Sequence, residues 1–330
     1  MDFVNELEKK IGTFASKGIT EYTISDAELS KNKKALLKVL NLFNQKAPDL
    51  YLNILIDAHV IDKEIALAAS NLFCSIDVPL ECENKGGKLL FDKKFYAGKA
   101  VVLNNYGLVF GFYLTYAVNE GDSLKAFMDR LDFAVNQYPN HIDFPQTEDF
   151  ALKDEKSELQ PAVTGLFSAK DIRYARDVSF ACRTFYTEGR AVPWFLSVLK
   201  PLRIYPSRFF ADFAEWQRCN NCDFKSGFVP EKENHKAIEK MQLLFLEEKY
   251  EEKKSVELLI LVKDLVSFNG AMSRLAGENE ECVIETSYNP DDLLSEEVYD
   301  LASFCENVCM LNCKVKIFAG EEGPDYSVIN

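Results

Sequence analysis

The sequence predicts an α/β protein in which strands and helices alternate along the first 144 residues. Short apolar runs alternate with amphipathic segments four times in about 140 residues. The run 108–114 is apolar at odd and even positions, which is typical of a strand buried on both faces of a parallel sheet. The segment 107–144 reads as strand, loop, helix and strand, which is one right-handed crossover unit.

The elements of this first part follow in a regular order. Strands are predicted over 19–25, 50–57, 74–82, 108–114 and 141–144, and helices over 3–17, 32–44, 63–73, 93–106 and from 124 to Pro139. In the last helix, one face is apolar and the other is predicted to face solvent, with Lys125, Asp129, Arg130 and Asp132. Residues 84–88 are predicted to form a turn.

The pattern of alternating strands and helices ends after residue 144. Residues 145–165 are polar and predict a loop, and helices are expected over 169–188, 194–200, 208–218 and 235–254. Aromatic residues at helical spacing in 208–218 predict core packing. The tail predicts strands over 256–262, 282–287 and 314–318, with helices over 267–276 and 295–310 between them. We therefore expect three parts: an α/β part over 1–150, a helical extension over 151–254 and a small α/β module over 255–330.

Composition excludes several classes of function. The chain has 330 residues, of which 47% are hydrophobic, and its net charge of −14 argues against nucleic acid or an anionic membrane surface as a partner. No apolar run reaches the ~18 residues that a membrane span needs, and the N-terminus is too charged for a signal peptide. Nine scattered cysteines are typical of reduced thiols. We expect a cytoplasmic protein.

Several stretches of the first 144 residues resemble one known family. A strand–loop–helix–strand stretch of cobalamin-dependent-type radical SAM proteins is matched here at Gly121-Asp122-Ser123-Leu124, Leu131-Asp132-Phe133 and Pro139-Asn140-His141-Ile142. An earlier strand of that family is similar to SIDVPLECE at 75–83. The segment 169–227 resembles the tail that follows the barrel in some bacterial members. The resemblance covers about two-thirds of the chain. It implies a partial β/α barrel that begins after the family's first strand.

The resemblance also implies a pocket for S-adenosylmethionine. By their matching positions, Asp26 and Glu28 would face the amino group of the cofactor, Glu81 the ribose, and Asn119 and Glu120 the adenine. Carboxylates at the carboxyl ends of strands lie where α/β-barrel enzymes have their active sites. The alternative is that such residues cap helices and solvate loops, which is at least as good an interpretation of Asp26 and Asp122.

The sequence departs from the family in its cluster motif. Radical SAM enzymes hold a [4Fe–4S] cluster through Cys-x3-Cys-x2-Cys, and neither this triplet nor an N-terminal cobalamin-binding domain is present. We expect a protein without cluster-dependent catalysis, a pseudoenzyme or partner-dependent remnant that could bind S-adenosylmethionine. The alternative is an active radical SAM enzyme, for methyl transfer or a related reaction, whose cluster part lies upstream or on another chain.

Two groups of cysteines are candidates for metal binding. Cys219-Asn-Asn-Cys222 could form half of a zinc knuckle, which would make the chain a zinc-stabilised interaction protein, but two more ligands are needed. Cys305, Cys309 and Cys313 have a spacing that on a helix would place them on one face, where they are expected to pack as small hydrophobic residues.

Two further hypotheses concern an acid–base site and a partner. Glu81, Glu120 and His59 could converge as acid and base groups of an unrelated α/β enzyme. His141 begins a predicted strand, and a histidine in a position such as that of His59 or His141 more often has a structural role than a catalytic one. The sequence contains no P-loop, His-Glu-x-x-His or Gly-x-Ser-x-Gly motif. An open barrel leaves an unpaired strand edge, at which we expect a protein partner or a second copy.

Overall fold

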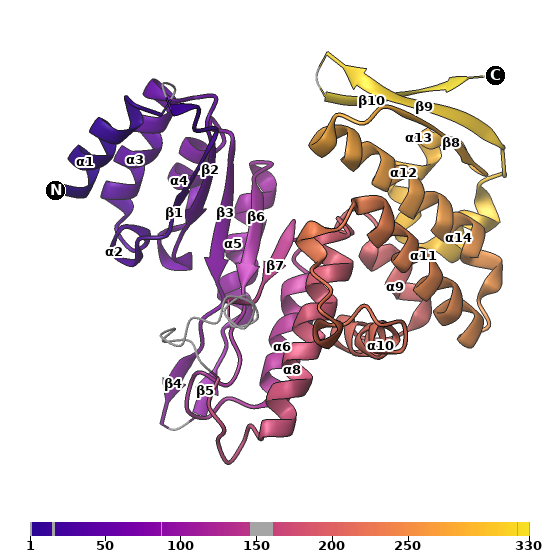
Figure 1. Cartoon of the computed structure of the whole chain (residues 1–330), viewed down its shortest axis with the longest axis horizontal. Helices are drawn as coiled ribbons and strands as arrows, with labels where there is room; N and C mark the ends of the chain where they lie inside the picture. The colour runs from indigo at the N-terminus through magenta and orange to yellow at the C-terminus, as the bar shows by residue number, and fades with distance from the viewer. Residues whose placement is uncertain (1, 15–16, 87, 146–160, 322, 330) are drawn as a thin grey trace. The chain divides into compact units, whose positions relative to one another are not determined.

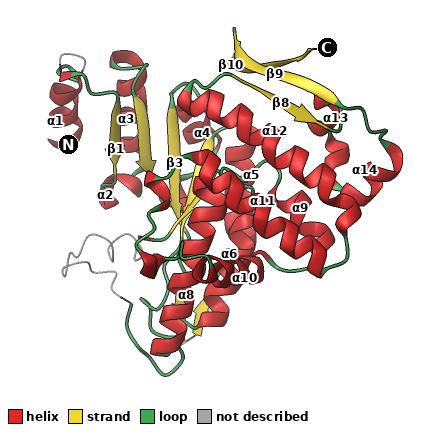
Figure 2. Cartoon of the chain, turned by 45° about the vertical axis from the view of Figure 1, so that its right-hand side comes forward, coloured by secondary structure: helices red, strands yellow, loops and turns green. Residues whose placement is uncertain are grey.

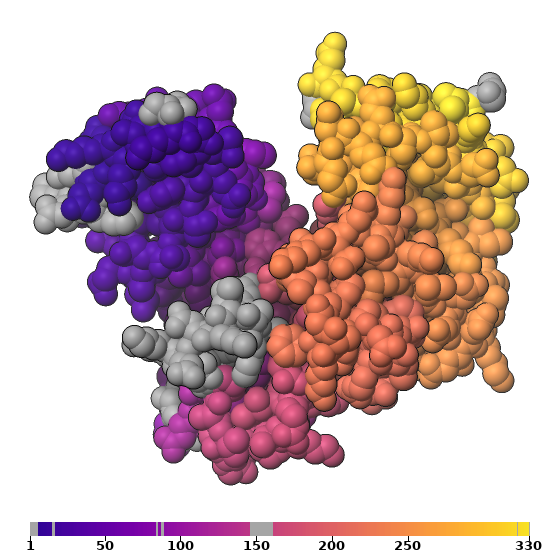
Figure 3. Space-filling view, viewed as in Figure 1, coloured from indigo at the N-terminus to yellow at the C-terminus, as the bar shows by residue number. Residues whose placement is uncertain are grey.

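The computed structural model describes residues 2–14, 17–86, 88–145, 161–321 and 323–329. The chain divides into two compact units, Met1–Ile172 and Arg173–Asn330 (Figure 1). Figure 3 shows the first unit in indigo to magenta and the second mainly in orange to yellow. Among the described residues, no helix is both long and apolar enough to cross a membrane.

The first unit is built on a five-stranded parallel sheet. Its order is β1-β2-β3-β6-β7, in which all four neighbouring pairs are parallel. The strands are β1 (Glu21–Ile24), β2 (Tyr51–Leu55), β3 (Cys74–Pro79), β6 (Val109–Tyr113) and β7 (His141–Asp143) (Figure 1). A separate hairpin, β4 (Glu83–Lys85) and β5 (Lys88–Leu90), occupies the predicted turn. The predicted α/β class with a parallel sheet is thus confirmed.

The helices of this unit form one layer. They are α1 (Asp2–Ile11), α2 (Ala27–Ser30), α3 (Lys33–Lys46), α4 (Lys63–Ala69), α5 (Lys93–Asn105) and α6 (Leu124–Val135). The sheet adds its strands in chain order, so right-handed crossovers place the connecting helices on the same face. Contacts of α1 with α3, α3 with α4 and α4 with α5 agree with this arrangement. The sheet is therefore singly wound.

The two faces of the sheet differ because side chains alternate along a strand. The face toward the helices is apolar and fully buried, with Ile54, Ile76, Phe110, Phe112 and Ile142 in its centre. The opposite face carries polar and small residues: Thr23, Asn53, Ser75, Asp77, Gly111, Tyr113, His141 and Asp143. The predicted burial of 108–114 on both faces holds only in part, because on the polar face Gly111 is buried, Tyr113 is half-buried and Val109 is 39% exposed.

The sheet is open among the residues that the structure describes. Strands β1 and β7 are its two edges, and neither pairs with a further described strand. The described strands thus do not close into a barrel. A partner at the open edge stays a prediction.

The second unit has a helical core rich in aromatic rings. Its helices are α8 (Ala169–Cys182), continued by a π-helical turn over Arg183–Glu188, then α9 (Phe195–Leu202), α10 (Pro206–Cys219), α11 (His235–Glu252) and α12 (Leu259–Glu278). Phe185 meets Phe209, Phe213 and Phe245 at ring-centroid distances of 4.9, 5.0 and 6.2 Å. The predicted core role of the aromatic residues in 208–218 is confirmed by their burial at Phe209, Phe210 and Phe213.

An antiparallel sheet completes this unit. Its order is β10-β9-β8, with β8 (Cys282–Thr286), β9 (Cys313–Gly320) and β10 (Gly323–Ile329), and all three strands contact α12 (Figure 2). Short helices α13 (Pro290–Leu293) and α14 (Leu301–Asn307) connect β8 to β9. Strand β10 has no counterpart in the predicted elements.

Two predictions for the tail are wrong. Residues 256–262 are helical, as a 3₁₀ turn over Val256–Leu258 and the start of α12, which also contains the helix predicted over 267–276. A short apolar run does not by its pattern distinguish a helix from a strand, and this run includes Val256 and Ile260, which are 51% and 46% exposed. The helix predicted over 295–310 is shorter, because α14 ends at Asn307.

Candidate functional site

A cavity of about 580 Å³ lies at the carboxyl ends of the parallel strands. Residues from or just beyond the ends of β1, β2, β3 and β6 line it, together with Pro145 after β7. The carboxyl edge is where the connecting loops of parallel sheets gather ligand-binding residues. This position makes the cavity the candidate site of the first unit.

The cavity combines carboxylates, hydroxyl groups and apolar patches. Asp77 and Glu81 supply the carboxylates, and the other polar side chains are Thr23, Ser25, Cys82, Tyr113, Thr115 and Asn119. The apolar lining consists of Ile24, Leu55, Pro79, Leu80, Val118 and Pro145. No lysine or arginine is among the described lining residues. The described part of the site is therefore polar and acidic.

A buried tyrosine holds Glu81 at the end of β3. The Tyr96 hydroxyl accepts the backbone N–H of Glu81 at 2.9 Å and donates to its carbonyl at 3.4 Å. Burial raises the pKa of Tyr96 to about 12, so the hydroxyl stays protonated at neutral pH. Helix α5, which begins after the N-cap Asp92, thereby fixes the backbone that carries the Glu81 carboxylate.

The loop after β6 is held by a buried ion pair. Arg130 donates to both carboxylate oxygens of Asp122 at 3.1 Å and to the carbonyl of Thr115 at 3.0 Å. Asp122 also accepts the backbone N–H of Ala117, whose φ of 55° is left-handed. The prediction that Arg130 lies on the solvent face of α6 is therefore wrong. Arg130 is buried, because Asp122 neutralises its charge inside the loop that carries Thr115 and Asn119.

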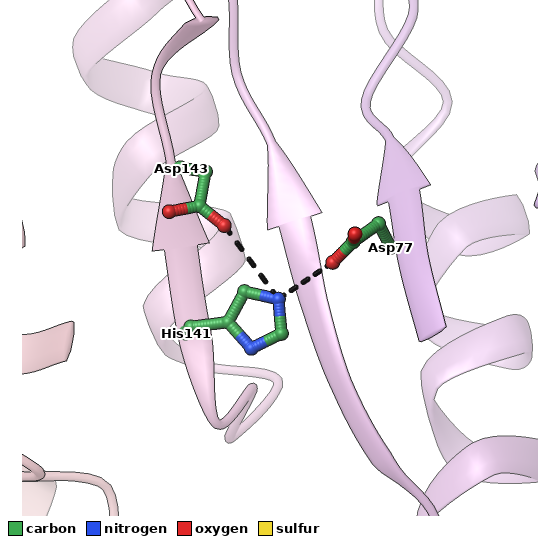
Figure 4. Close-up of side chains that lie close together, drawn as sticks. All are labelled: Asp77, His141 and Asp143. Carbon is green, nitrogen blue, oxygen red and sulfur yellow. Dashed lines mark hydrogen bonds and ion pairs between the residues drawn. The ribbon is translucent and has the colours of Figure 1, made fainter. Parts of the chain in front are cut away.

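Three potential metal ligands converge on the polar face of the sheet. Nε2 of His141 lies 2.6 Å from a carboxylate oxygen of Asp77 and 3.6 Å from one of Asp143 (Figure 4). The side chains are 20%, 12% and 16% exposed, in that order. Among the described residues, this is the one group of three histidine, cysteine or acidic side chains whose ligand atoms come this close, within 4.8 Å.

The register of the sheet brings these residues together. Asp77 on β3, Gly111 on β6 and His141 on β7 are successive partners across three strands. A Cβ atom at position 111 would collide with the imidazole of His141. The missing side chain of Gly111 therefore lets His141 reach across β6 to Asp77. Asp143 follows two residues after His141, so it lies on the same face.

The structure separates the residues that the sequence suggested for the cofactor. Glu81 and Asn119 line the cavity, whereas Asp26, Glu28 and Glu120 are exposed and do not belong to the lining. Asp26 caps α2 by accepting the N–H of Leu29 at 2.7 Å. The contact of Asp26 is thus that of a helix cap, which was the alternative interpretation of this residue. A cofactor role for Asp26, Glu28, Glu81, Asn119 and Glu120 stays a prediction.

The cysteines do not gather into a metal site in the described chain. No three cysteine sulfurs come together there, and no third ligand joins Cys219 and Cys222. Burial, with a smaller effect of Asp223, raises the pKa of Cys222 to about 11, which disfavours the thiolate that zinc binds. The zinc knuckle stays a prediction. The one-face arrangement of Cys305, Cys309 and Cys313 is wrong, because α14 ends between Cys305 and Cys309, and Cys313 begins β9.

The suggested acid–base trio does not assemble in the cavity. Of the three residues, Glu81 alone belongs to the lining. His59 lies in a short 3₁₀ turn, where its Nδ1 is 2.9 Å from Asp57, and its side chain is 69% exposed.

Sequence reasoning missed the cluster around His141. The available signal was a charged residue, Asp77, in the middle of an otherwise apolar strand, together with His-x-Asp on the last strand. Their convergence depends on register and on Gly111, which a single sequence does not specify.

Comparisons with solved structures show a weak similarity. No protein-family model matches the chain, and no curated protein matches its sequence. Two solved structures of the radical S-adenosylmethionine methyltransferase TsrM from Kitasatospora setae match with 11% identity and a TM-score of 0.34. One contains cobalamin and a [4Fe-4S] cluster, and the other contains tryptophan and the analogue aza-SAM. The match covers 43% of this chain but only 30% and 29% of those chains, so it spans less than a third of TsrM.

Proposed function

We propose that the first unit binds S-adenosylmethionine, or a closely related cationic nucleoside, in the cavity at the carboxyl edge of the sheet. The observation that carries this proposal is the charge of the cavity. Its described lining contains Asp77 and Glu81 but no lysine or arginine. Opposite charges attract strongly in a partly dehydrated site, so this lining favours a ligand with positive charge.

The same lining disfavours phosphorylated ligands. Phosphate sites in proteins use arginine, lysine or the N-terminus of a helix after a glycine-rich loop. The sequence has no P-loop, and the described cavity has no cationic side chain. S-adenosylmethionine carries a sulfonium and an ammonium group, and it lacks phosphate. It therefore meets the charge requirement that ATP and the dinucleotides fail.

Size and apolar surface also suit such a ligand. A volume of about 580 Å³ lies within the ~300–1,000 Å³ of small-molecule sites. Leu55, Leu80 and Val118 supply apolar surface for an adenine ring, and the hydroxyls of Thr23 and Thr115 can bond to a ribose. The Glu81 carboxylate at the end of β3 can accept hydrogen bonds from an ammonium group or from ribose hydroxyls.

The residues of this chain do not fit a resident four-iron cluster. Such a cluster needs three or four cysteine thiolates around one site, and the sequence has no Cys-x3-Cys-x2-Cys triplet to supply them. We therefore propose binding of the nucleoside and derive no cluster-dependent step. The sequence-based expectation that this chain lacks such chemistry can be tested by iron and sulfide analysis after anaerobic purification.

The proposal is tested by calorimetric titration of the full chain with S-adenosylmethionine. Wild-type protein is compared with Glu81→Gln and with the matched variant Glu83→Gln. Both substitutions remove one carboxylate from exposed positions two residues apart, but Glu83 pairs with Lys85 and does not line the cavity. We expect one ligand per chain, with affinity about tenfold weaker in Glu81→Gln and unchanged in Glu83→Gln.

Two results would contradict the proposal. Absence of saturable binding at millimolar ligand would remove it outright. Equal weakening by both substitutions would indicate attraction by the general negative charge of the chain, which is −14, instead of binding in the cavity.

A further inference from the structure

We propose that Asp77, His141 and Asp143 form a binding site for one divalent first-row cation, with Mn²⁺ as the reference ion. The site goes beyond the nucleoside proposal and does not depend on it. Three side chains from two strands, β3 and β7, supply one imidazole nitrogen and carboxylate oxygens (Figure 4). Mixed nitrogen and oxygen ligands suit Mn²⁺, Fe²⁺ and Zn²⁺.

The distances are close to those that a bound ion requires. For metal–ligand distances of about 2.0–2.2 Å, two ligand atoms in tetrahedral or octahedral coordination lie ~3.0–3.5 Å apart. Nε2 of His141 is 3.6 Å from Asp143 and 2.6 Å from Asp77. An ion would replace the hydrogen bond between His141 and Asp77, and these two atoms need to separate by less than about 1 Å. Rotation of the two side chains can supply this movement.

The backbone is arranged so that the histidine reaches its partners. Gly111 lies between Asp77 and His141 in the register, and any side chain there would occupy the space of the imidazole. A glycine in the middle of a strand weakens that strand, because it has no side chain to pack and a high conformational entropy. The space above Gly111 is therefore a feature that the cluster uses.

Ligand number and access favour an ion over a purely structural pair. A strand-to-strand hydrogen bond would need only Asp77, whereas Asp143 adds a second carboxylate at 3.6 Å. All three side chains are partly exposed, and Asp77 also lines the cavity. Three protein ligands would leave coordination positions open, as in catalytic metal sites.

The test is titration of the chelator-treated full chain with Mn²⁺ alone, followed by the electron paramagnetic resonance signal of free Mn²⁺. Mn²⁺ is preferred to Zn²⁺ because nine cysteines would compete for a softer ion. Wild-type protein is compared with Asp143→Asn, His141→Gln and the matched control His59→Gln. His59 also pairs with an aspartate, at 2.9 Å from Asp57, but the described chain places no third ligand beside that pair.

We expect one Mn²⁺ per chain in wild-type protein and in His59→Gln, and affinity at least about tenfold weaker in Asp143→Asn and His141→Gln. Asp143→Asn preserves the contact between His141 and Asp77, so it remains informative if His141→Gln fails to fold. Mn²⁺ should also raise the melting temperature of wild-type protein but not that of Asp143→Asn.

Absence of saturable Mn²⁺ binding below about 1 mM would overturn the proposal, as would binding that Asp143→Asn leaves unchanged. Because no nucleoside is present in this titration, its failure leaves the nucleoside proposal standing. Conversely, the calorimetric titration contains no metal, so a failure there does not bear on the cation site.

Discussion

The helical core of the second unit and the polar sheet face of the first unit differ in how their charged residues pair. In the helical core, basic side chains contact acidic ones: Arg274 contacts Glu239, Lys249 lies 2.9 Å from Asp212, and Arg183 lies 2.6 Å from Glu231. On the sheet of the first unit, two carboxylates converge on one histidine, and the described lining of the adjoining cavity contains acids without lysine or arginine.

This difference separates structural charge from charge that is available for binding. A neutralised pair inside a core fixes the positions of helices and offers little to a ligand. Carboxylates gathered at the carboxyl edge of a parallel sheet can instead attract a cation or a positively charged molecule. The second unit therefore serves as the internal reference for the first.

The largest expected effect follows from loss of a matched charge in the second unit. Arg274→Ala removes a buried guanidinium and leaves the Glu239 carboxylate, whose side chain is 14% exposed, without its partner, so we expect the free energy of unfolding to fall by about 3–5 kcal/mol. Urea denaturation followed by tryptophan fluorescence measures this unit alone, because the two tryptophans, Trp194 and Trp216, both lie in it.

Lys263→Ala is the matched control for that variant. Lys263 forms an exposed pair with Glu247, with side chains 44% and 43% exposed, so its loss should cost less than about 1 kcal/mol. Equal effects of the two variants would show that burial does not distinguish these pairs.

Two buried groups of the second unit, His235 and Asp264, are expected to change the free energy of unfolding in opposite directions as pH falls. Burial, with Arg190 and Arg274, lowers the pKa of His235 from 6.5 to about 4. The unfolded chain then binds the proton first, so stability is lost as pH falls from 6.5 toward 4, by up to ~3 kcal/mol. Burial raises the pKa of Asp264 from 3.8 to about 6, so the folded state binds that proton first and gains stability over the same fall.

The two contributions can be separated by substitution. His235→Asn should flatten the loss of stability between pH 6.5 and 4, and Asp264→Asn should steepen it. Urea denaturation at several pH values, again followed by tryptophan fluorescence, measures both. If Asp264→Asn left the pH profile unchanged, the raised pKa of this carboxyl would be refuted.

A smaller effect is expected at the centre of the first unit. Gly111→Ala places a methyl group in the space of the His141 imidazole, which should cost about 1–3 kcal/mol. The thermal transition seen by far-ultraviolet circular dichroism should shift to a lower temperature, whereas the transition temperature seen by tryptophan fluorescence, which reports on the second unit, should stay unchanged. Adding His141→Ala should restore stability, since it removes the collision.

Gly98→Ala provides the control for this variant. Gly98 lies within α5, and a Cβ atom there would meet no other atom within 4 Å. Alanine should therefore be neutral or stabilise the helix by up to about 1 kcal/mol. Destabilisation of equal size at both glycines would contradict a specific role for the space above Gly111.

The smallest expected effect concerns the anchor of Glu81. Tyr96→Phe removes the hydroxyl that bonds to the Glu81 backbone, at a cost of about 1 kcal/mol, as measured by thermal denaturation. Tyr205→Phe, at a position that is 74% exposed, should have no effect. A Tyr96→Phe protein as stable as wild type would show that the hydroxyl does not hold this strand end.

Much of the first unit could be predicted from the sequence, because its strands and amphipathic helices have different periods. Prediction failed where one pattern fits two structures, as in the apolar run 256–262, which is helical. It also failed where tertiary contacts decide, as for Arg130, whose partner Asp122 lies eight residues earlier in a loop. Glu81 and Asn119 line the cavity because they follow strands, as their positions in the sequence indicate, whereas the contacts of His141 depend on register across Gly111.

The most direct test of the account compares S-adenosylmethionine, S-adenosylhomocysteine and ATP in calorimetric titrations of the wild-type chain. The first two share every group except the methyl that makes sulfur positive, and ATP replaces the amino-acid part with phosphates. An acidic cavity whose described lining has no cationic side chain predicts tightest binding of S-adenosylmethionine, weaker binding of S-adenosylhomocysteine and none of ATP. Tighter binding of ATP than of S-adenosylmethionine would contradict the account.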